Sequence, residues 1–335
     1  MRLEDLQNTL AEASQVFVLT DENVAMFWLP EIKHWLDCER AVEIVVKAGE
    51  KYKTLATAQR IWRILLKHNA DRHAVLVNLG GGMISDLGGF VASCYQRGIR
   101  FVNVPTTLLA MVDASIGGKN GVDLAGCKNQ IGTFAEPLEV MVSPVYLTTL
   151  PDREILSGLA EMVKYGFIAD EDMLKVDDRN YEQYILRAGK IKREIVEEDF
   201  REEGDRKVLN FGHTLGHAME SVSFTTECPL THGEAVAAGM WCALWLSVNQ
   251  CDLDVEVLDN YLPKMKLLLS EAEWCLKPED VDAIMAYLDH DKKNAHGQHG
   301  FVLLKDLEKP VCDQLVPDAL VRQSLFELMN LLNDE

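Results

Sequence analysis

The chain has 335 residues, of which 48% are hydrophobic and 26% charged, and its 33 Lys and Arg against 53 Asp and Glu give a net charge of −20. This acidity argues against a protein that binds nucleic acid or an anionic membrane through its general surface. The composition excludes disordered and fibrous proteins, and the length suffices for one large domain or two.

Short β-branched runs alternate with helical stretches over the first 150 residues. The pattern predicts strands over 15–20, 42–47, 74–79 and 100–104, and a helix over 55–68. Strands that alternate with helices pair in parallel, with helices on both faces of the sheet. We therefore predict a Rossmann-like α/β domain over residues 1–150.

Strand signals fade after residue 151, and helix-forming composition takes their place. Helical spacing predicts helices over 152–169, 181–200, 206–222 and 233–250. The remainder of the chain, 151–335, is thus expected to be a helical domain. Ligands of open α/β sheets bind beyond the carboxyl ends of the strands, so we expect the active site in an interdomain cleft.

Two predicted turns follow neighbouring strands. Gly80, Gly81 and Gly82 come directly after the strand at 74–79 and precede a helical stretch. Bare N–H groups at a helix N-terminus suit a pyrophosphate, although the spacing is not the usual dinucleotide fingerprint and a simple tight turn is the alternative. Thr106 and Thr107 follow the strand at 100–104 and could cap a helix or contact a ligand.

A polar stripe marks the predicted helix at 206–222. Arg206, Asn210, His213 and His217 recur at intervals of four, three and four residues, which places them on one face of a helix. Gly212 beside them would cost a helix about 1 kcal/mol relative to alanine. Close packing or ligand access explains such a glycine, and the stripe indicates a functional site rather than a core histidine.

Further polar residues mark two other predicted helices. His232 opens the helix at 233–250, while Glu161 and Lys164 share one face of the helix at 152–169. Two histidines and one glutamate from separate helices would form a catalytic zinc site with an open fourth position. Spacing between helices carries no distance, however, and Glu161 could equally be an ion-pair partner of Lys164.

Basic residues recur near these motifs. They are Arg97, Lys119, Lys128, Lys164, Lys192, Arg206, Lys292 and Lys293. Glycine beside lysine in a loop, as at Lys119, suggests a clamp for phosphate or carboxylate, and a solvated surface lysine is the alternative. The histidines at 290, 296 and 299 are better explained as a polar loop than as a metal site. An acidic chain is expected to gather its cations in one small positive cleft.

The eight cysteines are scattered, without the short spacings of a zinc ribbon or a thioredoxin-type site. The N-terminus carries acid where a signal peptide has a basic region, and no run of about 18 apolar residues occurs. Scattered thiols fit a reducing compartment. We therefore expect a cytoplasmic protein without a membrane partner.

Taken in order, these segments resemble the dehydroquinate synthase family. The likeness lies in 49–53, 80–86, 96–98, 104–109, 112–119, 128–129, 150–165, 210–220 and 232–240. It implies an NAD-binding N-terminal domain, a helical C-terminal domain that binds metal and substrate, a homodimer, and a bound divalent metal, Zn²⁺ or alternatively Co²⁺. Ser85, Phe200 and the order Gly126-Cys127-Lys128 depart from the usual family pattern.

The resemblance also implies roles for individual residues. The metal ligands would be Glu161, His213 and His232. The substrate contacts would be Arg97, Asp113, Lys119, Asn129, Lys164, Lys192, Arg206, Asn210, His217 and one or both of Lys292 and Lys293. The cofactor contacts would be Asp21, Glu50, Lys53, Gly81, Gly82, Asp86, Thr106 and Thr107, with Asp113, Lys119 and Lys128 near both ligands.

The family reaction is a step of the shikimate pathway, which leads to chorismate and the aromatic amino acids. It converts 3-deoxy-D-arabino-heptulosonate 7-phosphate into 3-dehydroquinate and phosphate by transient oxidation with NAD, phosphate elimination, re-reduction and aldol closure. Three alternatives stay open: a cyclase of sedoheptulose 7-phosphate or glucose 6-phosphate, a metal-dependent polyol dehydrogenase, and an inactive NAD- or metal-binding paralogue. Retention of Lys119, Asn129 and Arg206, with Asn210 and His217, favours the carboxylate-bearing substrate.

Overall fold

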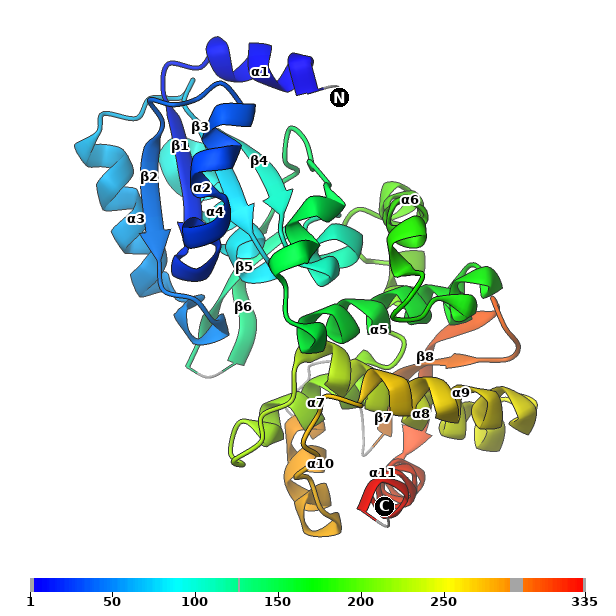
Figure 1. Ribbon diagram of the computed structural model, residues 1–335. Helices are drawn as coiled ribbons and strands as arrows, with labels where there is room; N and C mark the ends of the chain where they lie inside the picture. The colour runs from blue at the N-terminus through cyan, green and yellow to red at the C-terminus, as the bar shows by residue number, and fades with distance from the viewer. Residues whose placement is uncertain (1–2, 126, 290–297, 334–335) are drawn as a thin grey trace. The chain divides into compact units, whose positions relative to one another are not determined.

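The computed structural model describes residues 3–125, 127–289 and 298–333, and the chain divides into two compact units, residues 1–150 and 151–335. Unit 1 contains a parallel sheet, whereas unit 2 is mainly helical (Figure 1). None of the helices in the described ranges combines the length and apolar character that a membrane span requires. The interdomain cleft stays a prediction from the sequence.

Unit 1 alternates strands and helices. Its elements are α1 (Leu3–Ala11), β1 (Val16–Asp21), α2 (Glu22–Trp35), β2 (Val42–Val46), α3 (Leu55–Lys67), β3 (Val75–Gly80), α4 (Gly82–Cys94), β4 (Arg100–Pro105), β5 (Lys119–Leu124) and β6 (Cys127–Phe134). Strands β2, β1, β3 and β4 lie in this order in one parallel sheet. The four predicted strands and the predicted helix α3 are confirmed, while the antiparallel hairpin β5–β6 was not predicted.

Helices cover both faces of this sheet. On one face, Phe17 of β1 and Leu76 of β3 join Ile61 of α3 and Leu87 of α4 in one buried cluster. Helix α2 packs against β1, β2 and β3, and its Trp28 is buried outside that cluster. Burial on both faces is what parallel strands rich in valine, isoleucine and leucine require. The predicted doubly covered sheet is therefore confirmed.

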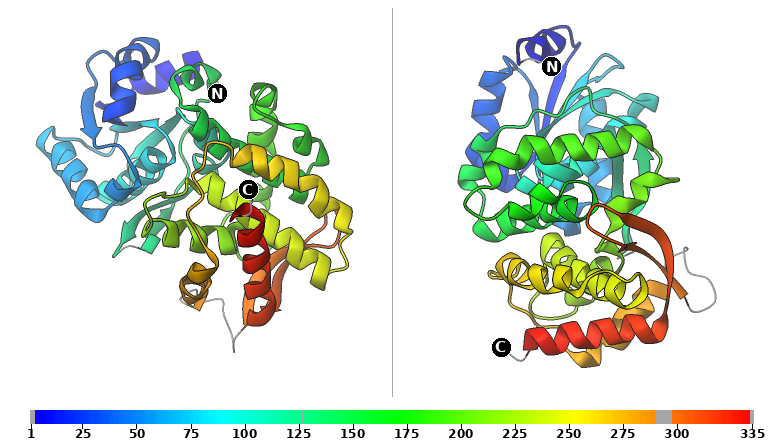
Figure 2. Two further views of the ribbon diagram at one scale, coloured as in Figure 1. Left: turned by 60° about the horizontal axis from the view of Figure 1, so that its bottom comes forward. Right: turned by 90° about the vertical axis from the view of Figure 1, so that its right-hand side faces the viewer.

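Unit 2 is built from helices and one hairpin. Its elements are α5 (Asp152–Ile168), α6 (Ile185–Glu198), α7 (His213–Ser223), α8 (His232–Gln250), α9 (Val255–Leu268), α10 (Val281–Asp289), β7 (Gln298–Leu304), β8 (Pro310–Pro317) and α11 (Asp318–Asn333). Helix α11, red in Figure 2, packs against the buried helix α8. The hairpin β7–β8 was not predicted from the sequence.

The helix predicted over 206–222 is not continuous, and this expectation was wrong. Residues Asp205–Asn210 form a 3₁₀ helix (η7), and α7 begins only at His213. Gly212 between them has φ of 79°, a left-handed conformation that favours glycine. A Cβ on Gly212 would lie 2.5 Å from Cγ of Met240 in α8. Close packing of the chain on α8 therefore both breaks the helix and explains the glycine.

We expect Gly239→Ala to separate α7 from α8 and to lower the stability of unit 2. A Cβ on Gly239 would lie 2.0 Å from the carbonyl oxygen of Gly212 and 2.8 Å from the backbone nitrogen of Gly216. Backbone atoms cannot rotate away, so the cost falls at the upper end of about 1–3 kcal/mol for overpacking. Thermal unfolding should show a Tm lower by about 6–12 °C.

The matched control is Gly300→Ala in β7, because a Cβ at Gly300 meets nothing within 4 Å. Its Tm should equal that of the unaltered protein. Equal Tm values for the two variants would contradict the close approach of α7 and α8.

Candidate functional site

Three helices of unit 2 bring Glu161, His213 and His232 together. Oε1 of Glu161 in α5 lies 3.2 Å from Nε2 of His213 in α7 and 3.2 Å from Nε2 of His232 in α8. Two imidazole nitrogens and a carboxylate oxygen that converge in this way form a donor set suited to Zn²⁺ or Co²⁺. The residues present therefore fit a divalent metal, as the sequence spacing suggested but could not measure.

The buried carboxylate of Glu161 also holds Lys164 in an ion pair through its second oxygen, Oε2. The ion pair with Lys164 is thus present, and it leaves Oε1 facing the two histidines. Burial alone would raise the pKa of Glu161, but Lys164 and the two histidines outweigh burial and hold this pKa well below its usual range. Glu161 is therefore ionised, which is the form that binds a metal.

His217 stands beside the other two histidines. Its ring centroid lies 5.2 Å from that of His213 and 5.7 Å from that of His232, and the ligating atoms of the three histidines lie within 4.8 Å of one another. Unlike the other two, however, His217 is exposed. An exposed imidazole next to a metal site can ligate the ion or carry protons to solvent.

Glu220, which was not predicted as a site residue, orients His232. Its Oε2 lies 3.6 Å from Nδ1 of His232, and its side chain is buried. Burial alone would lower the pKa of His232, but the carboxylates of Glu161 and Glu220 raise it to about 9. A carboxylate on the second ring nitrogen fixes the orientation of a ligating histidine. The available signal was the position of Glu220 three residues after His217, on the same helix face.

The first turn of α8 is tied to the first turn of α5. Arg153 donates from Nε and Nη2 to the two carboxylate oxygens of Glu234, each at 2.7 Å. Glu234 also forms a capping box with Thr231. This double fixation determines where α8 presents His232. The pair was not predicted, although Thr231-x-x-Glu234 is a recognisable capping signature.

Two of the remaining polar residues predicted in unit 2, Arg206 and Asn210, contact the loop at 199–204. The buried Arg206 in η7 donates from Nη1 to the carbonyl oxygen of Phe200 at 2.5 Å. Asn210 donates from Nδ2 to Glu202 at 2.7 Å, an acidic partner that was not predicted. Lys192 is buried on α6. Lys292 and Lys293 lie outside the described residues.

In unit 1, the turns after β3 and β4 lie side by side at the carboxyl edge of the sheet. The amide of Thr106 donates to the carbonyl oxygen of Gly80 at 3.0 Å. A Cβ on Gly81 would lie 2.9 Å from Cγ2 of Thr107, so only glycine allows this approach. Thr107 accepts from the amide of Ala110 at 3.2 Å, which confirms the predicted cap. This edge is where ligands bind in open α/β sheets.

A buried lysine joins several predicted cofactor residues near this edge. Nζ of Lys53 lies 2.6 Å from Glu50, 3.2 Å from Asp86 and 2.9 Å from Oδ1 of Asn129. A fourth partner, Asp123, lies 3.8 Å away and was not predicted. Burial alone would lower the pKa of Lys53, but Asp86 and Glu50 raise it above its usual range. Lys53 therefore stays charged and holds α4 and β6 to the segment at 50–53.

The other predicted residues of unit 1 lie on different elements of the unit. Asp21 ends β1 and caps α2 by accepting from the amides of Asn23 and Val24. Asp113 lies in a π-helical turn (η3, Ala110–Ala114). Lys119 and Lys128 lie toward opposite ends of the β5–β6 hairpin, because Lys119 pairs with Phe134 while Lys128 lies next to the turn.

Within unit 1, Arg97 lies far from the turn at 80–82. It precedes β4 and so lies at the amino edge of the sheet, in a cavity that Arg72 and Arg100 also line. Gly81 and Thr106 lie at the opposite, carboxyl edge. The role of Arg97 toward substrate stays a prediction.

The chain is similar to known proteins over most of its length. Residues 43–157 match the family model of the 3-dehydroquinate synthase N-terminal part, and residues 158–294 match that of the C-terminal part. The 3-dehydroquinate synthase of Parabacteroides distasonis is 38% identical over 96% of this chain and 93% of that protein.

Two solved structures resemble the chain closely. One is 2-deoxy-scyllo-inosose synthase complexed with carbaglucose-6-phosphate, NAD⁺ and Co²⁺, with a TM-score of 0.86 and 25% identity over 97% of this chain and 94% of that one. The other is ValA, a 2-epi-5-epi-valiolone synthase from Streptomyces hygroscopicus with NAD⁺ and Zn²⁺ bound, with a TM-score of 0.82 and 25% identity over 94% and 90%.

Proposed function

The chain belongs to the 3-dehydroquinate synthase family, and from this premise we propose that it converts 3-deoxy-D-arabino-heptulosonate 7-phosphate into 3-dehydroquinate and phosphate. The observation that carries the proposal is the convergence of Glu161, His213 and His232 from three helices, with Lys164 paired to the same glutamate. These are the positions at which the family motifs imply metal and substrate binding. The proposed reaction is a step of the shikimate pathway.

We propose NAD and Zn²⁺ as the cofactors, with Co²⁺ as a possible replacement for zinc. The two solved relatives that hold NAD⁺ with Co²⁺ or Zn²⁺ support this assignment. Glu161, His213 and His232 would hold the metal. The start of α4 at Gly81 and Gly82 suits the pyrophosphate of NAD. When bound, the metal supplies a Lewis acid and NAD supplies a hydride acceptor.

The carboxylates around Lys53 are proposed to bind the cofactor too. Glu50 and Asp86, both held by Lys53, present oxygens that can accept hydrogen bonds from ribose hydroxyls, and Asp21 does the same from the end of β1. Thr106 and Thr107 line the adjacent turn. Lys53 keeps these acids in place by neutralising their mutual repulsion.

On the substrate side, the chain supplies cations and one proton carrier. We assign Lys164, Lys192 and Arg206 from unit 2, and Lys119 and Lys128 from unit 1, to the phosphate and carboxylate groups. Arginine suits the carboxylate because its planar fork can bind both oxygens. Asp113, Asn129 and Asn210, with Arg97 and one or both of Lys292 and Lys293, complete the proposed contacts. The exposed His217 would exchange the substrate's hydroxyl proton with water.

We expect Lys53→Met to weaken NAD binding about 30-fold or more, because removing one partner of a buried charge cluster costs at least about 2 kcal/mol. Without the cation, Glu50, Asp86 and Asp123 repel one another and move from the positions proposed for ribose binding. Calorimetric titration with NAD measures the change in Kd. Lys51→Met, at an exposed neighbouring position, is the control and should keep the original Kd. The same Kd for both variants would remove Lys53 from the cofactor site.

One assay separates the candidate reactions. The protein is supplied with NAD, Zn²⁺ and, in turn, the heptulosonate phosphate, sedoheptulose 7-phosphate, glucose 6-phosphate or a simple polyol. Phosphate release from the heptulosonate alone, without net NADH, supports the proposal. Phosphate release from another sugar phosphate would identify a related cyclase, net NADH a polyol dehydrogenase, and neither product an inactive paralogue.

We further propose that the protein is a cytoplasmic homodimer whose partner is a small sugar phosphate and not a nucleic acid. The family resemblance supports the dimer, and the net charge of −20 speaks against nucleic acid as a partner. Light scattering on the purified protein measures the oligomeric state, and a monomer would contradict the proposed dimer.

A further inference from the structure

We propose that Cys228 and Cys275 are a site of reversible disulfide formation, and that this bond fixes the segment leading to His232 and thereby slows the release of metal. The inference rests on the metal site of the proposed function. It concerns residues with no part in the proposed chemistry. The site's co-reactant would be a low-molecular-weight disulfide.

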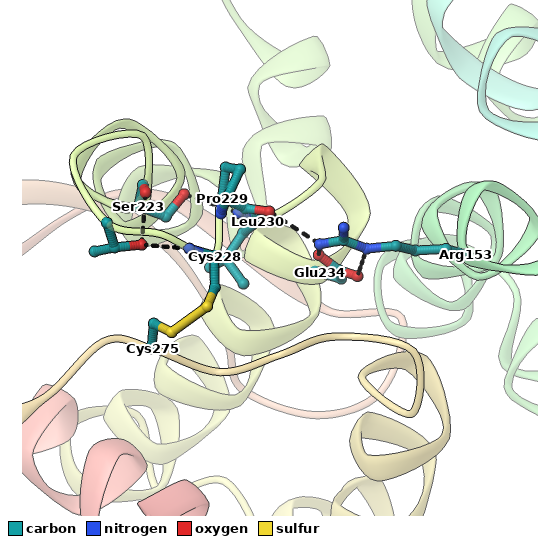
Figure 3. Close-up of a disulfide and its surroundings, with 8 residues drawn as sticks. Arg153, Ser223, Cys228, Pro229, Leu230, Glu234 and Cys275 are labelled. Carbon is teal, nitrogen blue, oxygen red and sulfur yellow. Dashed lines mark hydrogen bonds and ion pairs between the residues drawn. A yellow bond between two sulfur atoms is a disulfide. The ribbon is translucent and has the colours of Figure 1, made fainter.

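The two cysteines meet across unit 2. Cys228 lies in the loop between α7 and α8, and Cys275 lies between α9 and α10, 47 residues later in the chain. Their Cα atoms are 5.8 Å apart and their sulfur atoms are joined (Figure 3). Both side chains are partly exposed, so small reagents can reach them. The eight cysteines were expected to be scattered thiols, because a sequence separation of 47 conceals this pairing.

The loop that holds Cys228 is anchored by hydrogen bonds to the two residues that follow the cysteine. Oγ of Ser223, at the end of α7, accepts from the amide of Leu230 at 2.9 Å. Arg153 donates to the carbonyl oxygen of Pro229 at 2.9 Å and also holds Glu234 (Figure 3). The disulfide adds a third, covalent attachment, to a segment of unit 2 that these hydrogen bonds do not reach.

A chain of contacts leads from this loop to the metal ligand. Ser223, which accepts from Leu230, donates to the backbone carbonyl of Glu220 at 2.7 Å. The carboxylate of Glu220 in turn lies 3.6 Å from Nδ1 of His232. Moreover, His232 follows Cys228 by only four residues. Loosening of the loop is therefore expected to loosen the orientation of His232.

Without the covalent bond, hydrogen bonds rather than buried apolar side chains keep the loop closed. The side chains at 224, 225, 227 and 229 are exposed, so the loop buries little apolar surface of its own. Segments of this kind open locally at low free energy. The disulfide ties Cys228 to Cys275 and so opposes that opening. Reduction should thus raise the rate at which His232 leaves the metal.

Thiol–disulfide exchange at these two cysteines needs no group from the active site. The thiolate of one cysteine attacks oxidised glutathione, forming a mixed disulfide and releasing one glutathione thiolate. The thiolate of the other cysteine then attacks the protein sulfur of this mixed disulfide and releases the second glutathione. Two protein thiols lose two electrons and two protons, and one small disulfide becomes two thiols.

The test compares zinc release from the oxidised and the reduced holoprotein, freed of reagent, into a chromophoric chelator. Alkylation with mass spectrometry verifies each thiol state. We expect release from the reduced form to be about 10-fold faster, the low end of the effect of disturbing an outer partner of a metal ligand. Cys228→Ser and Cys275→Ser should behave as the reduced form under both conditions. Cys251→Ser, at the far end of α8, should keep the difference.

Hydrogen exchange in the metal-free protein provides a second readout. Amides at 224–233 should exchange faster after reduction, in Cys251→Ser as in the unaltered chain, and this difference should vanish in Cys228→Ser. Equal zinc release and equal exchange in both redox states would overturn the inference. A second zinc ion bound by the reduced protein and lost in Cys228→Ser would also overturn it, in favour of a thiolate metal site that Glu273 completes.

The two proposals fail in distinguishable ways. Absence of zinc from both redox forms would overturn the metal site of the proposed function. Stoichiometric zinc that leaves both forms at one rate would overturn only the role of the cysteines.

Discussion

His213→Ala should lose its stoichiometric zinc and, with it, turnover. Nε2 of His213 lies 3.2 Å from the Glu161 oxygen on which His232 also converges, so the substitution removes one of three proposed donors. Two donors cannot hold the ion as three do, and the loss of affinity should exceed the roughly 10–100-fold that follows removal of an outer partner. Elemental analysis after dialysis measures the zinc, and phosphate release measures the turnover.

His217→Ala decides which histidines are ligands. One of its ring nitrogens lies within 4.8 Å of those of His213 and His232, but the exposed side chain suits proton transfer better than metal binding. We expect this variant to keep its zinc while turnover falls by about 100-fold or more, the usual range for a lost general acid or base. Full zinc in His213→Ala would break the ligand assignment. Loss of zinc from His217→Ala would place His217 among the ligands.

The sheet of unit 1 could be predicted because each of its strands can be recognised from the residues of that strand and its flanking turns. The strands at β1 to β4 are apolar runs bounded by turn residues, and each boundary falls within one residue of the prediction. The β5–β6 hairpin was not predicted because its strands, from Lys119 to Phe134, mix glycine, asparagine and lysine without alternation of apolar and polar residues. Its stability comes from packing on α4, which no pattern within the segment reports.

For the candidate site of unit 2, the sequence indicated which residues to expect but not the distances between them. The spacing of His213 and His217 on one face indicated a polar cluster, yet it gave no distance to Glu161 on another helix. The same limit hid the contact between Glu220 and His232, and the pairing of Cys228. The break at Gly212 was missed for a related reason, since its cause lies in α8 and not in the neighbouring sequence.

The buried cations connect the acidity of the chain with its site. Among the described residues, the buried lysines and arginines are Lys53, Lys164, Lys192 and Arg206, and all four were predicted as site residues. Burying a charge is costly unless it is paired, and Lys53 and Lys164 are held by carboxylates. In this chain with 53 acidic residues, the buried cations are therefore found among the residues proposed for the chemistry.

The second large effect is expected for Lys164→Ala, which removes one cation proposed to stabilise the reacting substrate and should reduce turnover about 100-fold or more while zinc and NAD stay bound. Both Lys164 and Glu161 are buried, so the substitution leaves the carboxylate without its cation. Breaking such a pair costs about 3–5 kcal/mol. In the metal-free protein, Tm should therefore fall by roughly 10 °C.

Zinc should reverse most of this loss of stability but not the loss of turnover. A divalent ion at Glu161 replaces the missing positive charge, so the zinc-loaded variant should regain most of its Tm, whereas the cation proposed to contact substrate is still absent.

Lys190→Ala is the control, since Lys190 is 72% exposed and its pair with Glu194 spans 3.5 Å. A surface pair of this kind contributes little, so Tm and turnover should both stay unchanged. Near-normal turnover in Lys164→Ala would remove Lys164 from its proposed role, and an equal loss of Tm with and without zinc would show that the ion does not sit at Glu161.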